Sequence, residues 1–179
     1  MLKLTIPSTE LYDESKEEFI QTKEQTLNLE HSLISLSKWE SKWNKPFLTK
    51  DQKTTEETID YIRCMTITQN VDNELYNYIT NENIIQVRNY IEAEMTATKF
   101  SNNKKTINRE IITAEIIYYW MIALNIPFEC QKWHLNRLLT LINVCNLKNT
   151  PPKKMGRKEL VSRNASLNSA RKKALHSRG

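Results

Sequence analysis

The chain has almost no glycine: of its 179 residues, only Gly156 and Gly179 are glycines. Phosphate-binding loops, dinucleotide-binding turns and nucleophile elbows need glycine where the backbone crowds a ligand or adopts a positive φ. None of these motifs can be written in this sequence, and no nucleophile–base pair is visible. We therefore expect a protein that is not an enzyme, with no catalytic residue and no cofactor.

Cysteine and histidine are also scarce. Cys64, Cys130 and Cys145 form an odd set without a CxxC motif, which is typical of reduced, buried thiols in a cytoplasmic protein. Cys130 and His134 are four residues apart on an expected helix, but the sequence offers no third and fourth ligand for zinc. We expect no metal site, and we expect His134 at a boundary with one ring nitrogen hydrogen-bonded.

Long hydrophobic runs are missing. The longest apolar stretch, 111–124, is interrupted by Thr113 and Glu115, and it is shorter than the ~20 residues that a membrane-spanning helix needs. The N-terminus lacks a basic segment followed by an apolar one, so we expect neither a signal peptide nor a membrane partner.

Positive charge is concentrated near the C-terminus. Residues 148–179 hold ten Lys and Arg against one acid, Glu159, a net charge of +9. Residues 1–147 hold the other 16 bases and 20 acids, a net charge of −4, which gives +5 for the whole chain. A mildly acidic body with a basic arm indicates a partner-binding protein more than an enzyme.

The hydrophobic pattern predicts a mainly α-helical fold with a short N-terminal β element. Alternating apolar residues predict paired strands at 1–6 and 26–30, with the charged segment 14–24 as a solvated helix or a loop. Ser32 and the Thr54–Glu57 capping box predict two helix starts. The expected helices are 32–43, 54–65, 72–79, 81–95, 108–125 and 129–146. Asparagines stand where helix ends are expected, at Asn44, Asn81, Asn125 and Asn146.

The helix at 108–125 is apolar on nearly all faces, so we expect it to be central. With 129–146 it predicts an antiparallel helical hairpin joined through Pro127. The expected organisation is an N-terminal β and charged extension at 1–31, a helical core at 32–147 and a basic arm at 148–179, forming one domain with an appendage.

Two clusters inside the body have ordinary structural interpretations. Arg109, Glu110, Glu115 and Arg137 are expected to form exposed ion pairs at the rim of the hairpin. Trp39 and Trp43 share a helix with three lysines, Lys38, Lys42 and Lys45. They form either an aromatic and basic surface patch or, more often, a core face whose ring edges are covered by lysine stems.

The basic arm follows a stiff Pro151-Pro152 linker and carries Leu160, Leu167 and Ala174 seven residues apart. Alone in water such a helix is marginal, so we expect it to be mobile or ordered by a partner. The arm has no aromatic residue for base stacking, and phosphate binding would not require the apolar stripe. This favours a protein partner over nucleic acid, with a merely solvated terminus as the third interpretation. The expected partner-binding residues are Arg157, Lys158, Leu160, Arg163, Leu167, Arg171, Lys172 and Lys173.

Four segments carry a resemblance to a known family. They are SLISLSKWESKWNKPFL (32–48), TTEETIDYIRCMTI (54–67), REIITAEIIYYWMIALNIPFECQKWHLNRLLTLINVCNLKN (109–149) and PPKKMGRKELVSRNASLNSARKKAL (151–175). On these segments, a little over half of its length, the chain resembles the phage tail assembly chaperones. The resemblance implies a non-enzymatic protein of the host cytoplasm that binds the long tape measure protein and helps tail-tube subunits to assemble around it.

We therefore expect a phage tail assembly chaperone whose partners are tail proteins, with a possible homo-oligomer. Two alternatives stay open: a structural virion protein of the tail or head–tail junction, and a small nucleic-acid-binding protein. Absence from virions would separate the chaperone from the first alternative. A steep loss of DNA affinity with salt would support the second.

Overall fold

The computed structural model describes residues 1–13, 18–100, 111–151 and 156–176. In these residues the chain is mainly α-helical with short N-terminal strands, so the predicted fold class is confirmed. The chain divides into two compact units, 1–146 and 147–179. The first unit therefore contains the N-terminal strands together with the helices of the body.

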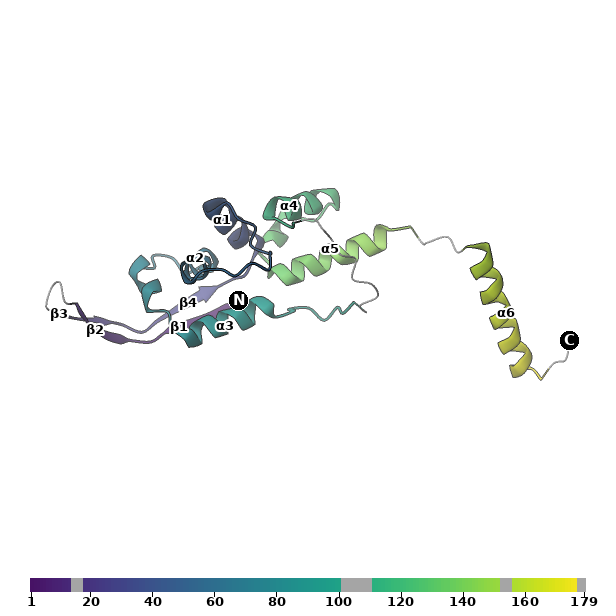
Figure 1. Ribbon diagram of the computed structural model, residues 1–179, viewed down its shortest axis with the longest axis horizontal. Coiled ribbons are helices and arrows are strands. Elements are labelled where there is room, and N and C mark those ends of the chain that lie inside the picture. The colour runs from purple at the N-terminus through teal and green to yellow at the C-terminus, as the bar shows by residue number, and fades with distance from the viewer. Residues whose placement is uncertain (14–17, 101–110, 152–155, 177–179) are drawn as a thin grey trace. The chain divides into compact units, whose positions relative to one another are not determined.

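The predicted strand pair is confirmed. Strands β1 (Leu2–Ile6) and β4 (Gln25–Leu29) are antiparallel, with Leu2 opposite Leu29 (Figure 1). Leu4, Ile6 and Leu27 are fully buried, as expected when alternate side chains face the same side of a ribbon. The apolar alternation therefore identified both the strands and the face that packs inward.

A second hairpin replaces the helix or loop predicted for 14–24. Strands β2 (Thr9–Asp13) and β3 (Glu18–Thr22) are antiparallel, with Tyr12 opposite Phe19, and residues 14–17 lie outside the described residues. The prediction was wrong for 18–22 because it gave more weight to the charged residues of the segment than to its β-favouring residues. Aromatic and branched residues at opposed positions favour a ladder, and charge does not prevent one.

Two capped helices follow, as predicted. Helix α1 (Leu33–Trp43) has Ser32 as its N-cap and ends at Asn44, whose φ of 52° is left-handed. Helix α2 (Thr55–Met65) begins with a capping box in which Thr54 and Glu57 exchange hydrogen bonds. Both starts follow from residues three apart in the sequence, and such local signals need no tertiary information.

Beyond α2 the chain runs along β4. Ile67 N–H donates to the Asn28 carbonyl at 2.8 Å, and Glu30 N–H donates to the Met65 carbonyl at 2.9 Å. The short helix expected at 72–79 is the 3₁₀ helix η1 (Asn73–Tyr78). Helix α3 (Asn81–Glu92) is capped by Thr80 and ends at Glu92, three residues before the predicted end at 95.

The predicted hairpin of 108–125 and 129–146 is corrected in three ways. Helix α4 (Ala114–Ala123) is shorter than expected, and residues 108–110 lie outside the described residues. It packs mainly against α1 rather than α5, and it is not central, since Tyr119 and Ile122 are 66% and 61% exposed. The second predicted helix is divided into the 3₁₀ helix η2 (Phe128–Lys132) and helix α5 (Leu135–Asn149).

The division between η2 and α5 has a tertiary cause. Ser32 and His134 form an isolated antiparallel bridge, and Leu135 N–H donates to the His31 carbonyl at 2.7 Å. This bridge holds the backbone near residue 134 in a strand-like pairing, which a continuous helix would not permit. Asn81 begins α3 as predicted, and Asn125 takes the expected positive φ of 52°. Asn146 does not end its helix, because α5 continues to Asn149.

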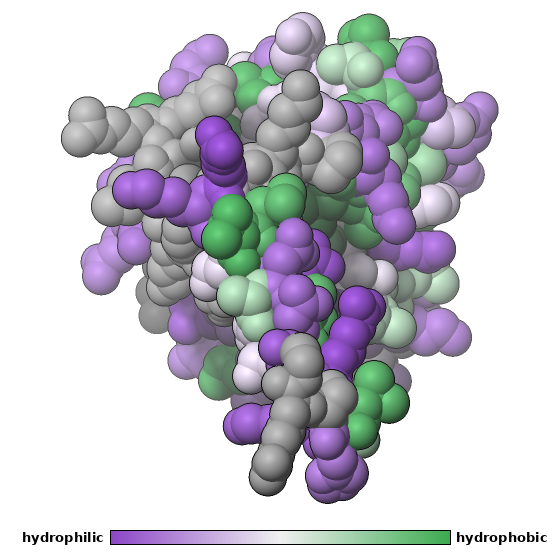
Figure 2. All heavy atoms as spheres, turned by 90° about the vertical axis from the view of Figure 1, so that its right-hand side faces the viewer, coloured by the Kyte–Doolittle hydropathy of each residue, from purple (hydrophilic) through white to green (hydrophobic). Residues whose placement is uncertain are grey.

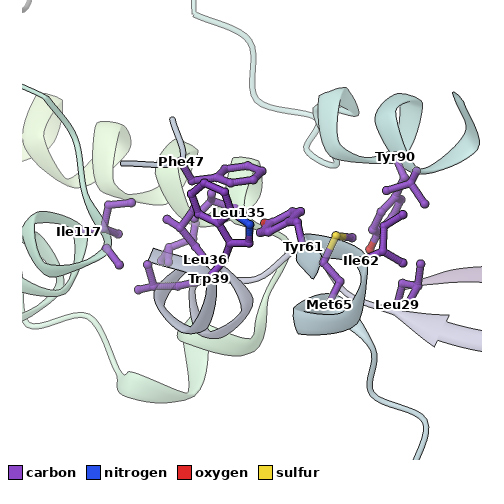
Figure 3. Packing of buried hydrophobic residues seen from close by; sticks show 14 of the residues in the cluster. Leu29, Leu36, Trp39, Phe47, Tyr61, Ile62, Met65, Tyr90, Ile117 and Leu135 are labelled. Atoms are coloured by element: carbon purple, nitrogen blue, oxygen red, sulfur yellow. The ribbon is translucent and has the colours of Figure 1, made fainter. Parts of the chain in front are cut away.

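The core of the first unit joins the strands to α1–α5. Figure 3 shows Trp39, Phe47 and Tyr61 grouped beside Leu36 and Leu135. The Phe47 and Tyr61 rings stack with centroids 3.9 Å apart, and the Trp39 ring meets Phe47 edge-on at 5.1 Å. Aromatic pairs in these geometries add to the stabilisation from apolar burial. The core thus places the 47–53 segment against α1 and α2.

Candidate partner interface

The basic arm contains one long helix, α6 (Arg157–Ala174). Gly156 is its N-cap and provides no side-chain hydrogen bond. Arg171, Lys172 and Lys173 lie in the last turn, where positive charge interacts favourably with the helix dipole. The helix predicted for this segment is therefore present, although its start has no polar side-chain cap.

The eight predicted partner-binding residues all lie on α6, and the described side chains of this helix are exposed. Leu160 is 48% exposed and Leu167 is 44% exposed. Their spacing of seven residues places them on one face, two turns apart. The helix therefore presents an apolar stripe that is available to a partner.

Positive charge surrounds this stripe. With 100° per residue, Arg163 and Arg171 fall on either side of the line through Leu160 and Leu167, whereas Lys158 and Lys172 fall away from it. Sequence reasoning missed Val161, which is 61% exposed beside Leu160. With 100° per residue, Val161 lies about 100° around the helix from Leu160, so it is exposed apolar surface outside the stripe.

The predicted structural interpretation of the tryptophan–lysine cluster agrees with the geometry. Trp39 is buried, and its indole N–H donates to the Glu57 carbonyl at 2.9 Å. Trp43 donates to Asp60, which also pairs with Lys42. Burial alone would raise the pKa of Asp60, but the hydrogen bonds from Lys42 and Trp43 hold it below its usual value. The cluster thus joins α1 to α2.

His134 belongs to a buried polar network rather than to a boundary. The His31 and His134 rings meet at 5.1 Å, and His31 Nδ1 shares a 2.6 Å hydrogen bond with the Tyr61 hydroxyl. His134 Nε2 donates to the Tyr90 carbonyl at 3.0 Å, and the Tyr90 hydroxyl donates to Glu30 at 2.6 Å. Burial lowers the pKa of both histidines, and the pKa of His31 falls to about 3.

The metal-site geometry considered for Cys130 and His134 does not form. Cys130 lies in η2 and His134 lies in the bridge that follows it, so the two residues do not share a helical face. Among the described residues, no group of three or more potential metal ligands occurs. The three cysteines are free, and burial raises the pKa of Cys64 and Cys130, which disfavours the reactive thiolate.

The predicted ion pairs at the hairpin rim are only partly described. Arg109 and Glu110 lie outside the described residues. The Arg137 guanidinium lies over the Trp133 ring, 4.1 Å from its centroid. Arg137 therefore makes a cation–π contact near the start of α5.

Figure 2 shows apolar side chains interspersed among hydrophilic ones over one face of the molecule.

In the part of the chain that the structure describes, no helix combines the length and apolar character required to cross a membrane. Comparisons with protein-family models, with curated proteins and with solved structures find no match for this chain.

Proposed function

We propose that this protein is a non-enzymatic binding factor that uses helix α6 to capture another protein. The observation that carries the proposal is an 18-residue helix with exposed leucines in a basic arm. An exposed helix with so little apolar surface is marginal in water. A partner that covers Leu160 and Leu167 would stabilise it, since full burial of a leucine contributes about 1.5–3 kcal/mol.

The charge division indicates the chemistry of the partner surface. The arm has a net charge of +9, whereas residues 1–147 have −4. An acidic helix or groove with an apolar strip would meet both features of α6, and charge complementarity would accelerate the encounter. The resemblance of the chain to phage tail assembly chaperones supports a phage tail protein as this partner.

Within this proposal the partners are tail proteins, with the tape measure protein first and tail-tube subunits second. The bound segment of the tape measure protein would remain covered in the host cytoplasm until tail-tube subunits compete for it. Nucleic acid is the second candidate, because the basic residues project around α6 rather than from one face. It would not use the two leucines, and this difference separates the candidates.

Co-expression with neighbouring tail proteins tests the proposal. We expect the full-length chain to retain a long helical tail protein in a pull-down. A variant with Leu160→Ser and Leu167→Ser should lose it, and a matched variant with the exposed Ser162→Ala and Ser166→Ala should not. Retention by the leucine variant, or by a chain ending at residue 150, would contradict capture by α6.

Mass spectrometry of purified virions and a DNA titration complete the test. A chaperone should be absent from virions, whereas stoichiometric presence would identify a structural component. Binding of DNA that weakens steeply with salt, and is unchanged in the leucine variant, would favour the nucleic-acid candidate.

A further inference from the structure

A pocket of about 390 Å³ is formed by residues of the first unit. Its wall is formed by the loop at 47–53, by α2 and by α3. Phe47, Tyr61, Ile62 and Val87 contribute buried apolar surface. The volume falls within the range of about 300–1,000 Å³ that is typical of ligand pockets. We call this cavity the α2–α3 pocket.

The aromatic wall of the pocket is fixed by contacts on its far side. The Tyr61 hydroxyl hydrogen-bonds His31, and its ring stacks on Phe47; Figure 3 shows the two rings together, with Ile62 on the same helix as Tyr61. Since the hydroxyl is already paired, Tyr61 offers mainly ring carbon to the pocket. This wall is therefore preformed and apolar.

The charged residues of the pocket carry a net positive charge, whereas the body is negatively charged overall. Lys53, Arg88 and Asp51 line it, which gives a local net charge of +1 inside a unit that is acidic overall. Lys53 Nζ lies 4.5 Å from the centroid of the Phe47 ring. Burial lowers the pKa of Lys53, against the opposing effects of Glu57 and Asp51. The Lys53 ammonium thus stands partly desolvated over an apolar wall.

The cations of the pocket have spare pairing capacity. Glu57 is occupied by Lys45 at 2.6 Å and by the Thr54 N–H at 2.8 Å. Among the ion pairs between described residues, neither Lys53 nor Arg88 has a partner within 4.0 Å. An incoming carboxylate would therefore meet two cations without displacing an existing pair.

We propose that the α2–α3 pocket binds a peptide segment of a partner protein in which an apolar side chain neighbours a carboxylate. The apolar side chain would lie against Phe47 and the half-buried Ile84 and Ile91, and the carboxylate would pair with Lys53 and Arg88. This inference rests on the proposed protein-binding function, to which it adds a second contact. It gives the acidic body a way to recognise the same kind of acidic, apolar sequence as the basic arm.

Carbon-rich walls distinguish this ligand from a simple anion. A phosphate would gain charge contacts but would leave the aromatic and aliphatic surface uncovered. An uncharged apolar peptide would cover the wall but leave both cations unpaired. Only a segment with both groups satisfies the whole pocket, and differential binding of this kind is the basis of specificity.

Titration of the ¹⁵N-labelled full-length chain with acetyl-Leu-Glu-amide tests the proposal directly. We expect chemical-shift changes confined to 47–62 and 84–91, with weak, millimolar affinity as befits a dipeptide. Acetyl-Leu-Gln-amide and acetyl-Ala-Glu-amide should each bind about tenfold more weakly. Absence of localised shifts, equal binding of the three peptides, or equal binding of inorganic phosphate would overturn the proposal.

Two surface variants locate the carboxylate contact. Lys53→Gln and Arg88→Gln should each weaken acetyl-Leu-Glu-amide binding about tenfold. The matched control Lys50→Gln, an exposed lysine of the same loop, should leave binding unchanged. Unchanged binding in both pocket variants would contradict the assignment. These measurements need no tail protein. They can therefore fail while α6 still captures its partner, and they can succeed if α6 does not.

Discussion

Glu40 is a buried carboxylate that joins segments distant in the sequence. Its side chain accepts the Phe47 N–H at 2.8 Å and the Ala114 N–H at 2.7 Å. The second bond satisfies a donor at the start of α4, where Thr113 makes no side-chain cap. The residue thus replaces a local cap with a long-range one and fixes α4 against α1.

Replacement of Glu40 by Gln should destabilise the protein by about 2–3 kcal/mol. The single amide oxygen of Gln can accept only one of the two backbone N–H groups. The amide NH₂ would face the other N–H, which would remain buried and unpaired. Urea denaturation of both proteins measures the change. Glu115→Gln on the exposed face of α4 is the control, with an expected change below about 0.5 kcal/mol. Equal effects of the two substitutions would refute the role of Glu40.

His31 predicts a loss of stability in mild acid. Its pKa is about 3 in the folded chain and near 6.5 when unfolded. Between these values the unfolded chain binds a proton that the folded chain excludes, so the free energy of unfolding falls as pH falls. From pH 7 to pH 5 the loss from His31 is about 2 kcal/mol, and the lowered pKa of His134 acts in the same direction.

Urea denaturation at intervals between pH 7 and pH 5 checks this prediction. The lowered pKa values of Glu57 and Asp60 affect stability mainly at more acidic pH, since carboxyl groups in unfolded chains titrate near pH 4. His31→Asn should flatten the profile in this window, whereas His176→Asn, on an exposed residue, should not. A wild-type profile that is already flat would contradict the prediction.

Residue-scale features were predictable when their partners were close in sequence. The Thr54–Glu57 box and the Ser32 cap involve partners three residues apart. The partners of Glu40 are seven and 74 residues away, and the network of His31 joins residues 30 and 60 apart. No periodicity in the sequence reports such pairings.

At the scale of elements, helix α6 begins at a weak cap. Gly156 has an extended backbone, with φ −62° and ψ 149°, and a Cβ placed there would meet nothing within 4 Å. Gly156→Ser should therefore add a hydrogen-bond acceptor for the first turn without strain. We expect helix α6 to gain a few tenths of a kcal/mol.

Secondary ¹³Cα chemical shifts of residues 157–162 measure this gain in helix population. Gly156→Ala adds the Cβ but no oxygen, so its helix population should not rise. If serine and alanine have the same effect, side-chain capping is not the cause. Because Gly156 lies outside the first compact unit, the thermal unfolding of that unit should not change in either variant.

Element boundaries were less predictable than the existence of elements. Apolar periodicity runs through 129–146, yet the Ser32–His134 bridge divides it into η2 and α5. Similarly, α4 is the most apolar helix of the body but exposes Tyr119 and Ile122. Composition indicates that a helix can be buried, whereas its neighbours decide which face is.

For the whole molecule, the charge division and the arm helix were readable from the sequence, but the α2–α3 pocket was not. Lys53 and Arg88 are 35 positions apart and lie on different elements. Only the packing of α3 beside α2 and the 47–53 loop brings them to one cavity. The arm could be predicted because its signals, net charge and leucine spacing, are contained within one continuous segment.

Removal of residues 151–179 should change the charge of the protein without unfolding its body. The deletion removes nine bases and one acid, which turns the net charge from +5 to −3. The described side chains of α6 are exposed, so little buried apolar surface is lost, and the free energy of unfolding should change by less than about 0.5 kcal/mol. At pH 7.5 the full-length chain should bind a cation exchanger and the 1–150 chain an anion exchanger. Retention of the basic behaviour would contradict the charge division. A broad, non-cooperative urea transition of the 1–150 chain would show instead that the arm is part of the folded body.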